Sequence, residues 1–378
     1  MAKGTSEAAR RPLDGPPAAV TFVVTTGTGS MDLYAQKLAE RLPVPTLTLD
    51  AFDRTGDLFG SALVSRASLR QIVRDAAIVR RLRGAEAPLH LPNHHLSRYG
   101  PLVGQPYVVT VHDLIRYFDL TREEPLIHRP NRRDRLYLGL DVGGIRRAEA
   151  VIAPSEATKS DLVRHLGFPD ERIAVVYEGV DHDVFQPSAR RVAPSPYVLV
   201  VGSEHPRKNV ATIFRALARL KREPRFASLK LVKVGAPGGS EAPFRAQTLA
   251  GLRASALAAE DVVFVGHATA HELAAYYAGA ACFLFPSLYE GFGLPSLEAM
   301  ACGCPVVVSD TPALREIAGE AACVVPATDD RALAEAIAAV VTDESVARDL
   351  RSRGLAHARR FSWERAAQNT FRVYERLL

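Results

Sequence analysis

The sequence is poor in cysteine, and its few cysteines form no recognisable disulfide or metal-binding pattern. Four cysteines occur among 378 residues, all of them in the second half of the chain. The one close pair, Cys302 and Cys304, lacks the two-residue gap of a zinc knuckle and has no histidine companion nearby. We therefore expect small, buried thiols in a reducing compartment, which indicates a cytoplasmic protein.

The chain also lacks a charge imbalance, a long apolar run and a secretion signal. Its 47 basic residues nearly balance 42 acidic ones, and a net charge of +5 argues against a dedicated nucleic-acid-binding protein. The longest apolar stretch, at 273–285, is too short to span a bilayer. Residues 1–17 contain charge and proline but no apolar signal core, so we expect a disordered leader.

Strand-like apolar runs alternate with helix-like stretches along the rest of the chain. Runs rich in valine, isoleucine and leucine that alternate with helices are typical of parallel sheets covered on both faces. The sequence therefore predicts an α/β protein with two doubly wound, Rossmann-like domains. The expected strands are 19–24, 44–49, 88–91, 107–111, 150–154 and 173–177 in the first half, and 197–202, 229–235, 261–266, 281–286, 305–309 and 322–326 in the second.

The expected domain boundaries follow from composition. The first domain is predicted to cover 18–187 and the second 197–361, with the linker 188–196 between them and a final helix over 362–378. Ligands of doubly wound sheets bind beyond the carboxyl ends of the strands. We therefore expect the site in a cleft where the two domains face each other.

The stretch SLYEGFGLPSLEAM, residues 287–300, sets two carboxylates around a glycine turn between a strand and a helix. Gly291 and Gly293 let backbone amides approach a ligand, and free amides at a helix start attract anions. Glu290 and Glu298 are instead suited to accept hydrogen bonds from sugar hydroxyls. The combination predicts a ligand with both a diphosphate and a sugar, that is, a nucleotide sugar. The alternative is that Glu298 is a solvated helix residue and Glu290 an ordinary turn residue.

A second strand-to-helix junction, GSEHPRKN at 202–209, has matching chemistry. Arg207 and Lys208 stand where a helix is expected to begin, a place where the helix dipole disfavours cations. An anion opposite them would offset this cost, which predicts a phosphate contact. Ordinary surface charge is the alternative.

Two loops of the first half also follow strands. Gly27 and Gly29 precede an amphipathic helical stretch within 25–42, and His112 and Asp113 come directly after another strand. A histidine at the carboxyl end of a strand has either a structural or a catalytic role, and the sequence leaves both open.

Together these residues resemble glycosyltransferase family 4, a large group of retaining enzymes with the GT-B fold. The resemblance is strongest over 197–310, where Glu290 and Glu298 form the Glu-x7-Glu signature around EGFGLP. It is looser in VHDL, in PSEATKSDL (154–162) and in EGVDHDVFQP (178–187).

The resemblance implies a role for each position. Arg207 and Lys208 would hold the diphosphate, Glu290 would bind the hydroxyls of the donor sugar, and Glu298 would bind the ribose. Gly29 would let its loop close on the phosphates, and His112 would touch the sugar from the acceptor side. The implied catalytic residues are Glu290, Arg207, Lys208 and His112, and the implied donor-binding residues are Gly29, Arg207, Lys208, Glu290, Gly291, Phe292, Gly293, Leu294 and Glu298.

The resemblance further implies transfer of a hexose from a UDP- or GDP-sugar to a hydroxyl acceptor, such as a glycan, a glycolipid or a natural-product precursor. Retention of configuration, no metal and no other cofactor are implied, and the final helix would pack back on the first domain. Two departures stand out. Asp32 brings negative charge to the first glycine loop, and Glu178 stands where asparagine is common.

Other classes of enzyme would account for part of these sequence features. A nucleotide-sugar epimerase would use the same architecture and donor. An NAD-dependent oxidoreductase would use Gly27, Gly29 and Asp50 as its fingerprint, although Asp32 opposes a pyrophosphate there. A metal-dependent transferase would use Asp181, His182 and Asp183, which lie in a stretch of family resemblance.

The first half also contains two basic clusters. The helix-like stretch 63–84 aligns Arg66, Arg70 and Arg74 on one face, and HRPNRRDR covers 128–135. Solvated helix faces would explain both clusters. Peripheral contact with an anionic membrane, at its inner face, is the other expectation. No nucleic-acid partner is expected.

Overall fold

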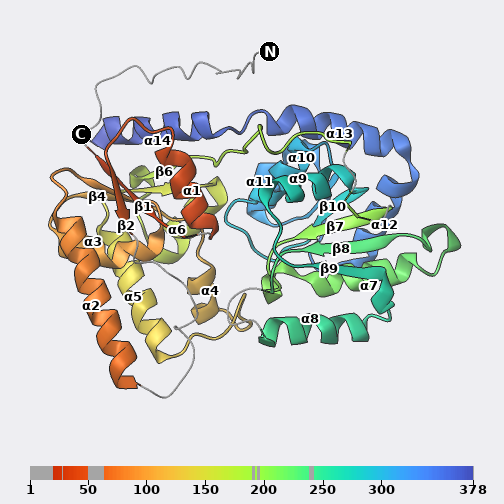
Figure 1. Ribbon diagram of the computed structural model, residues 1–378, viewed down its shortest axis with the longest axis horizontal. Coiled ribbons are helices and arrows are strands. Elements are labelled where there is room, and N and C mark those ends of the chain that lie inside the picture. The colour runs from red at the N-terminus through yellow and green to blue at the C-terminus, as the bar shows by residue number, and fades with distance from the viewer. Residues whose placement is uncertain are drawn as a thin grey trace, which may run out of the picture.

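The computed structural model describes residues 20–27, 29–49, 64–189, 192–193, 196–237 and 242–377. These residues form two parallel six-stranded sheets, one in each half of the chain. Figure 1 shows them side by side as two domains, each with helices packed around its sheet. All the expected strands are present to within about two residues at each end, and the predicted fold class is confirmed. The leader at 1–17 and Asp50 lie outside the described residues.

The N-terminal domain has the strand order β2-β1-β3-β4-β5-β6, which reverses direction between β1 and β3. Its strands are β1 (Thr21–Thr25), β2 (Thr46–Leu49), β3 (Leu89–Leu91), β4 (Tyr107–Thr110), β5 (Ala150–Ala153) and β6 (Ile173–Val175). Its helices are α1 (Ser30–Ala39), α2 (Val64–Arg83), η1 (His94–Tyr99), α3 (Gly100–Val103), α4 (Ile115–Thr121), α5 (Arg132–Arg147), α6 (Glu156–Leu166) and η2 (Asp170–Arg172).

The C-terminal domain has the order β12-β11-β10-β7-β8-β9, which reverses between β7 and β10. Its strands are β7 (Tyr197–Val201), β8 (Lys230–Val234), β9 (Val262–Val265), β10 (Cys282–Phe285), β11 (Val306–Ser309) and β12 (Cys323–Val325). Its helices are η3 (Pro206–Lys208), α7 (Val210–Leu220), η4 (Pro224–Phe226), α8 (Ala242–Ala254), η5 (Ala259–Asp261), α9 (Ala270–Gly279), α10 (Leu294–Ala301), α11 (Pro312–Ala318), η6 (Gly319–Ala321), α12 (Asp330–Thr342) and α13 (Glu344–Ala358).

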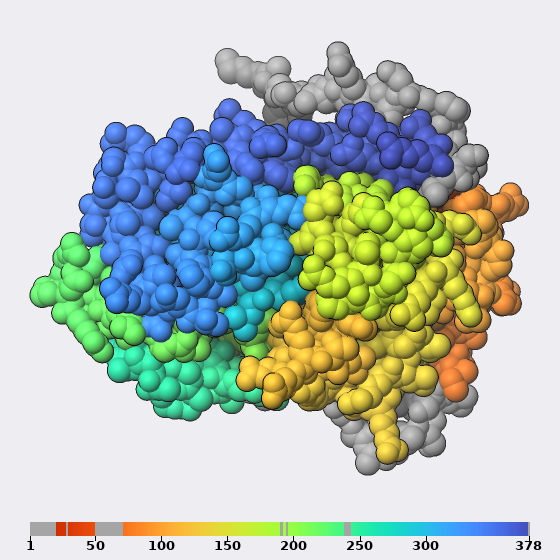
Figure 2. Space-filling model, turned by 180° about the vertical axis from the view of Figure 1, so that it is seen from behind, coloured from red at the N-terminus to blue at the C-terminus, as the bar shows by residue number. Residues whose placement is uncertain are grey.

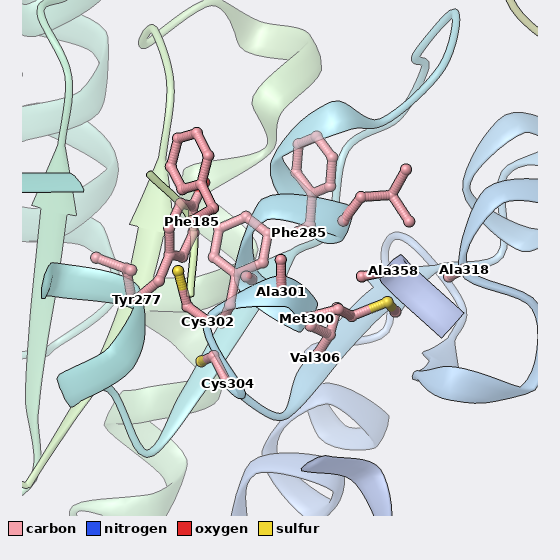
Figure 3. Close-up of a cluster of buried hydrophobic side chains, with 14 of the residues drawn as sticks. Phe185, Tyr277, Phe285, Met300, Ala301, Cys302, Cys304, Val306, Ala318 and Ala358 are labelled. Atoms are coloured by element: carbon pink, nitrogen blue, oxygen red, sulfur yellow. The ribbon is translucent and has the colours of Figure 1, made fainter. Parts of the chain in front are cut away.

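The central strands are apolar along their whole length because helices cover both faces of each sheet. In β11, Val306, Val307 and Val308 are each fully buried although they point to alternating faces. Figure 3 shows one face of this packing, where Met300, Cys302 and Cys304 belong to the same buried cluster as Phe185, Tyr277 and Phe285. The interpretation of the cysteines as small buried residues is confirmed for three of the four, and Cys323 is partly buried.

The chain passes between the domains twice, and the two passages lie against each other. Val180 in the first forms a parallel bridge with Ser362 in the second. A Cβ atom at Gly179 would lie 2.2 Å from the backbone nitrogen of Trp363, so this approach requires glycine. The backbones are therefore in direct contact at the junction.

The last helix, α14 (Trp363–Leu377), lies on the N-terminal domain. Its side chains Trp363, Phe371 and Tyr374 pack against the sheet and α1, in a cluster that includes Phe22 and Leu38. From behind, α13 and α14 run as one band over both domains (Figure 2). Within the described residues, no helix has the length and apolar character needed to cross a membrane.

Candidate active site

The topology places two loops of the C-terminal domain next to each other. Strands β7 and β10 are paired at the point where the strand order reverses, which is where doubly wound sheets bind ligands. The loop after β7 carries Arg207 and Lys208, and the loop after β10 carries Glu290. The loops also touch directly, because the Leu288 amide donates a 2.7 Å hydrogen bond to the Arg207 carbonyl.

The three charged side chains of these loops form one buried cluster. Arg207 Nη1 and Lys208 Nζ each lie 2.7 Å from the same oxygen, Oε1 of Glu290, and the side chains are 10–14% exposed. Burial raises the pKa of Glu290, but Arg207 and Lys208 outweigh it and hold that pKa at about 2. Burial and the adjacent Arg207 lower the pKa of Lys208 to about 8. In the absence of a ligand, Glu290 is thus the anion that faces the two cations.

The cluster also leaves hydrogen-bond donors unused. Arg207 Nε and His205 Nδ1 are buried without a hydrogen-bond partner in the described part of the chain. Burial and the nearby Arg207 lower the pKa of His205 to about 4, so its ring is neutral at pH 7. Gly293 begins α10 with a φ of 111°, a left-handed conformation that favours glycine. This turn leaves the amides of Phe292 and Gly293 without acceptors among the described residues.

Glu298, the second glutamate of the signature, lies in a different environment. It accepts a 3.2 Å hydrogen bond from the hydroxyl of Tyr277, a buried member of the core. Burial raises the pKa of Glu298 to about 7, and the charge of Glu178 adds to the rise. Nothing in the sequence indicates that one glutamate of the pair is held charged while the pKa of the other lies near neutral pH.

The N-terminal domain holds the glycine turn of the C-terminal domain. The Gly291 carbonyl accepts hydrogen bonds from the hydroxyls of Ser155 at 2.6 Å and Thr158 at 3.0 Å. The Tyr289 hydroxyl donates to Asp161 at 2.7 Å. Sequence reasoning missed these contacts, although their N-terminal members all lie in the segment PSEATKSDL that carries part of the family resemblance.

A further contact between the domains caps a helix. The two carboxylate oxygens of Glu316 accept hydrogen bonds from the Glu156 and Ala157 amides, at 2.7 and 2.9 Å. A Cβ atom at Gly291 would lie 1.9 Å from the His112 carbonyl oxygen, so glycine is needed where the loops meet. No local sequence pattern marks Glu316, because its partners are about 160 positions away in the chain.

His112 is buried in the N-terminal domain, beside this contact. Its Nε2 atom lies 2.9 Å from the Pro92 carbonyl and its Nδ1 atom 3.1 Å from Glu178 Oε1. Burial lowers the pKa of His112, but Glu178 outweighs this effect and raises it above the usual value. Both ring nitrogens are therefore engaged by the protein.

The first glycine loop is closed on itself by Asp32. This buried carboxylate accepts hydrogen bonds from the Thr25 hydroxyl and from the Gly29 amide. A Cβ atom at Gly27 would lie 2.0 Å from Asp32 Oδ2, so glycine makes room for the carboxylate. Gly29 itself has an ordinary φ of −72°. The carboxylate of Asp32 is therefore already hydrogen-bonded within its own loop.

The Asp-His-Asp triplet at 181–183 contacts other parts of the protein. Asp181 accepts from Lys37 at 2.8 Å, and His182 contacts the Phe361 carbonyl at 3.0 Å. Over the described ranges, no group of three or more His, Cys, Asp or Glu side chains is arranged to hold a metal ion.

Two family profiles match the chain. Residues 195–343 match "Glycosyl transferases group 1", and residues 52–184 match "Glycosyltransferase Family 4". Among curated proteins, O-antigen chain mannosyltransferase B of Escherichia coli is 30% identical over 297 residues, which cover 76% of this chain and 74% of that protein. The MMP α-(1→4)-mannosyltransferase of Mycolicibacterium hassiacum is 31% identical over 288 residues, 73% of this chain and 66% of that protein.

The solved structures support the same fold. Sucrose-phosphate synthase of Thermosynechococcus elongatus superposes with a TM-score of 0.75 at 23% identity, over 95% of this chain and 98% of that one. The Anabaena protein HepE, solved with UDP-glucose, superposes with a TM-score of 0.72 at 18% identity and the same coverage. With the two profiles and the curated relatives, these findings show that the chain is a glycosyltransferase of the GT-B fold and belongs to glycosyltransferase family 4.

Proposed function

We propose that this glycosyltransferase moves a hexose from a nucleotide diphosphate sugar to a hydroxyl acceptor, with retention of anomeric configuration. The observation that carries the proposal is the incomplete cluster after β7 and β10. Arg207 Nε and the amides of Phe292 and Gly293 are donors with no acceptor among the described residues, and Lys208 adds positive charge. A diphosphate would supply the missing acceptors.

The chemistry follows from this placement of charge. As the bond between the anomeric carbon and the diphosphate oxygen breaks, its electron pair stays on the diphosphate. Arg207 and Lys208 are fixed where that negative charge develops. The acceptor oxygen forms the new bond to the anomeric carbon on the same face, and its proton passes to the departing phosphate oxygen. Glu290 binds hydroxyls of the sugar, and Glu298 binds the ribose. Under this proposal, no metal ion is required, so EDTA should leave the rate unchanged.

The donor is tested by a thermal-shift panel of UDP-, GDP- and ADP-sugars, with NAD and NADP as rivals. The relatives named as mannosyltransferases and the neighbour solved with UDP-glucose make GDP-mannose and UDP-glucose the first candidates. A ligand at about a hundred times its dissociation constant adds roughly 2.7 kcal/mol, a shift of several degrees. A response to NAD or NADP alone would contradict the proposal. Conversion of the sugar without an acceptor would favour an epimerase instead.

A second proposal concerns where the enzyme works. Helices α2, α3 and α5 lie together on the outer face of the N-terminal domain (Figure 1). Five large apolar side chains are about half or more exposed on them: Ile72, Val73, Leu102, Leu136 and Leu140. Exposed arginines, including Arg74 and Arg132, accompany them. The side chains of Arg66 and Arg70 lie outside the described residues.

We propose that this face rests on an anionic bilayer at the cytoplasmic side, because apolar and basic side chains together match its lipids. Cosedimentation with vesicles of phosphatidylglycerol and phosphatidylcholine at low salt should show binding, and pure phosphatidylcholine should show little. Replacing Ile72 and Leu136 with serine should weaken it, whereas Leu33→Ser, an exposed leucine on α1, should not. Absence of binding at low salt would refute the proposal.

A further inference from the structure

Glu178 is the residue whose presence the sequence left unexplained. It follows β6, in the first passage between the domains, and its side chain is 11% exposed. One carboxylate oxygen, Oε1, lies 3.1 Å from His112 Nδ1. The other oxygen, Oε2, has no hydrogen-bond partner among the described residues.

The hydrogen-bond partners of His112 limit where the protons of the pair can be. The Pro92 carbonyl can only accept a hydrogen bond, so His112 Nε2 carries a proton. Nδ1 faces a carboxylate oxygen, and this contact also needs a hydrogen between the two atoms. An imidazolium beside a carboxylate satisfies both conditions. His112 is then fully occupied, whereas Glu178 keeps one oxygen that can only accept a hydrogen bond.

Glu178 also lies between the two halves of the site. On one side, its partner His112 belongs to the loop whose backbone touches Gly291. On the other side, its charge acts on Glu298 of the C-terminal domain. The other ionisable groups near the pair include Tyr34, whose ring stacks edge-on against His112, and Asp113, whose charge also acts on His112. They also include His94, whose ring centroid lies 6.3 Å from that of His112, and His90, on which the charge of His112 acts. Glu178 therefore carries an unused acceptor at the boundary between the domains.

We propose that Glu178, rather than His112, makes the substrate contact on this side of the site, by accepting a hydrogen bond from a substrate hydroxyl. His112 is a positioning residue that acts through Glu178 by fixing its carboxylate. The inference rests on the proposed function. The hydroxyl belongs either to the transferred hexose or to the acceptor, and the chemistry of recognition is the same in both cases. No proton is transferred in this contact.

The test is Glu178→Gln, which keeps the size of the side chain and removes its charge. The matched control is Glu171→Gln, an exposed glutamate in the turn before β6. The probes are the nucleoside diphosphate, the nucleotide sugar that stabilises the wild-type protein, and n-octyl α-mannopyranoside as a simple hydroxyl acceptor. A lost hydrogen bond to a charged group corresponds to a loss of about ten- to a hundredfold.

We expect Glu178→Gln to bind the nucleoside diphosphate like the wild type. If the contact is to the hexose, the nucleotide sugar loses its affinity advantage over the diphosphate. If the contact is to the acceptor, the KM for the octyl mannoside rises while binding of the nucleotide sugar is unchanged. Unchanged values for both would overturn the inference and leave the proposed function standing. A wild-type protein that binds no nucleotide sugar would instead overturn the proposed function.

The role of His112 is tested separately by NMR of its ring nitrogens. In the wild type, the ring should stay doubly protonated above pH 6.5, because Glu178 raises the pKa of His112, and in Glu178→Gln it should titrate at lower pH. A ring that titrates alike in both proteins would contradict the charge pair. If Glu178→Gln does not fold, Glu178→Asp keeps the charge and withdraws the carboxylate by one methylene, and the same losses are expected.

Discussion

Both domains bury an arginine beside a carboxylate, Arg98 with Asp141 in the N-terminal domain and Arg207 with Glu290 in the C-terminal domain. Arg98 binds both oxygens of Asp141 in a fork, with contacts of 2.7 and 2.9 Å, and His95 adds a third contact at 3.0 Å. Arg207 reaches Glu290 through one nitrogen, and its Nε atom has no acceptor in the described part of the chain.

The difference separates a structural ion pair from one that is open to a ligand. The fork around Asp141 joins η1 to α5 and leaves little hydrogen-bonding capacity for anything else. The cluster around Glu290 holds two cations against one oxygen and keeps buried donors unused, which is costly unless a ligand completes it. The two sheets are alike, so it is these loops, not the fold, that distinguish the domains functionally.

The largest expected effect on stability comes from breaking the complete pair. Arg98→Ala leaves Asp141 buried beside a histidine alone, and it should cost about 3–5 kcal/mol of the free energy of unfolding. Urea denaturation measures the loss, with Arg132→Ala, an exposed arginine of α5, as the near-neutral control. The affinity of the folded fraction for the nucleotide should not change. A large drop in that affinity would contradict the interpretation of Arg98 and Asp141 as a structural ion pair.

The largest effect on catalysis should come from Glu290. Glu290→Gln should retain nucleotide binding, because Arg207 keeps its charge and a bound diphosphate favours the charged form of Lys208, but lose sugar transfer by on the order of a hundredfold or more. Single-turnover transfer and calorimetric titration with the nucleoside diphosphate separate the two. Glu335→Gln, an exposed glutamate of α12, is the control. Near-normal turnover would remove Glu290 from the catalytic residues.

Arg207→Ala should have a smaller effect, divided between binding and rate. Lys208 still neutralises Glu290, so stability falls less than in Arg98→Ala, but the nucleoside diphosphate should bind about tenfold more weakly and transfer should slow. Arg219→Ala, a half-exposed arginine of α7, is the matched control. Unchanged binding and rate would refute the phosphate contact.

Glu298→Gln should stabilise the ligand-free protein at alkaline pH. The unfolded chain ionises this carboxyl near pH 4.5 and the folded protein near pH 7, so the folded state binds more protons between these values and loses stability as pH rises. The full shift would be worth about 3 kcal/mol, and partial exposure reduces it to about 1–2 kcal/mol. Glutamine stays neutral, so thermal unfolding at pH 5 and pH 8 should differ less in the variant. If the stability difference between pH 5 and pH 8 is the same in the wild type and the variant, the raised pKa of Glu298 is contradicted.

The effect that is smallest near neutral pH is a pH dependence of nucleotide binding. Lys208 has a pKa of about 8 in the ligand-free protein and must be charged to bind a diphosphate. Affinity should be level below pH 8 and fall above it by at most about tenfold per pH unit. Lys208→Arg should flatten the curve measured by calorimetry between pH 7 and 9.5. If affinity falls with pH equally in the wild type and in Lys208→Arg, the pH dependence belongs to a group other than Lys208.

The sequence was most informative where one short segment contains both a fold signal and its chemistry. Arg207 and Lys208 stand out because cations are unfavourable at a helix start, and Glu290 lies within a specific motif. It was least informative where a residue's partner is remote. No pattern in the neighbouring sequence marks the contact of the Tyr277 hydroxyl with Glu298. The same holds for the Ser155 and Thr158 hydroxyls that bind the Gly291 carbonyl, and for the helix cap made by Glu316.

The amino-acid sequence by itself determined the strands, the two doubly wound sheets and the loops that carry the charged residues, because strand periodicity and glycine turns are local properties. Only the tertiary structure decided which charges meet. Glu290 lies 82 positions from Lys208, and Glu178 lies 66 positions from His112. The burial of a carboxylate and the groups around it decide whether it is charged, neutral or available to a ligand. The fold determines both, and the residues adjacent in the sequence determine neither.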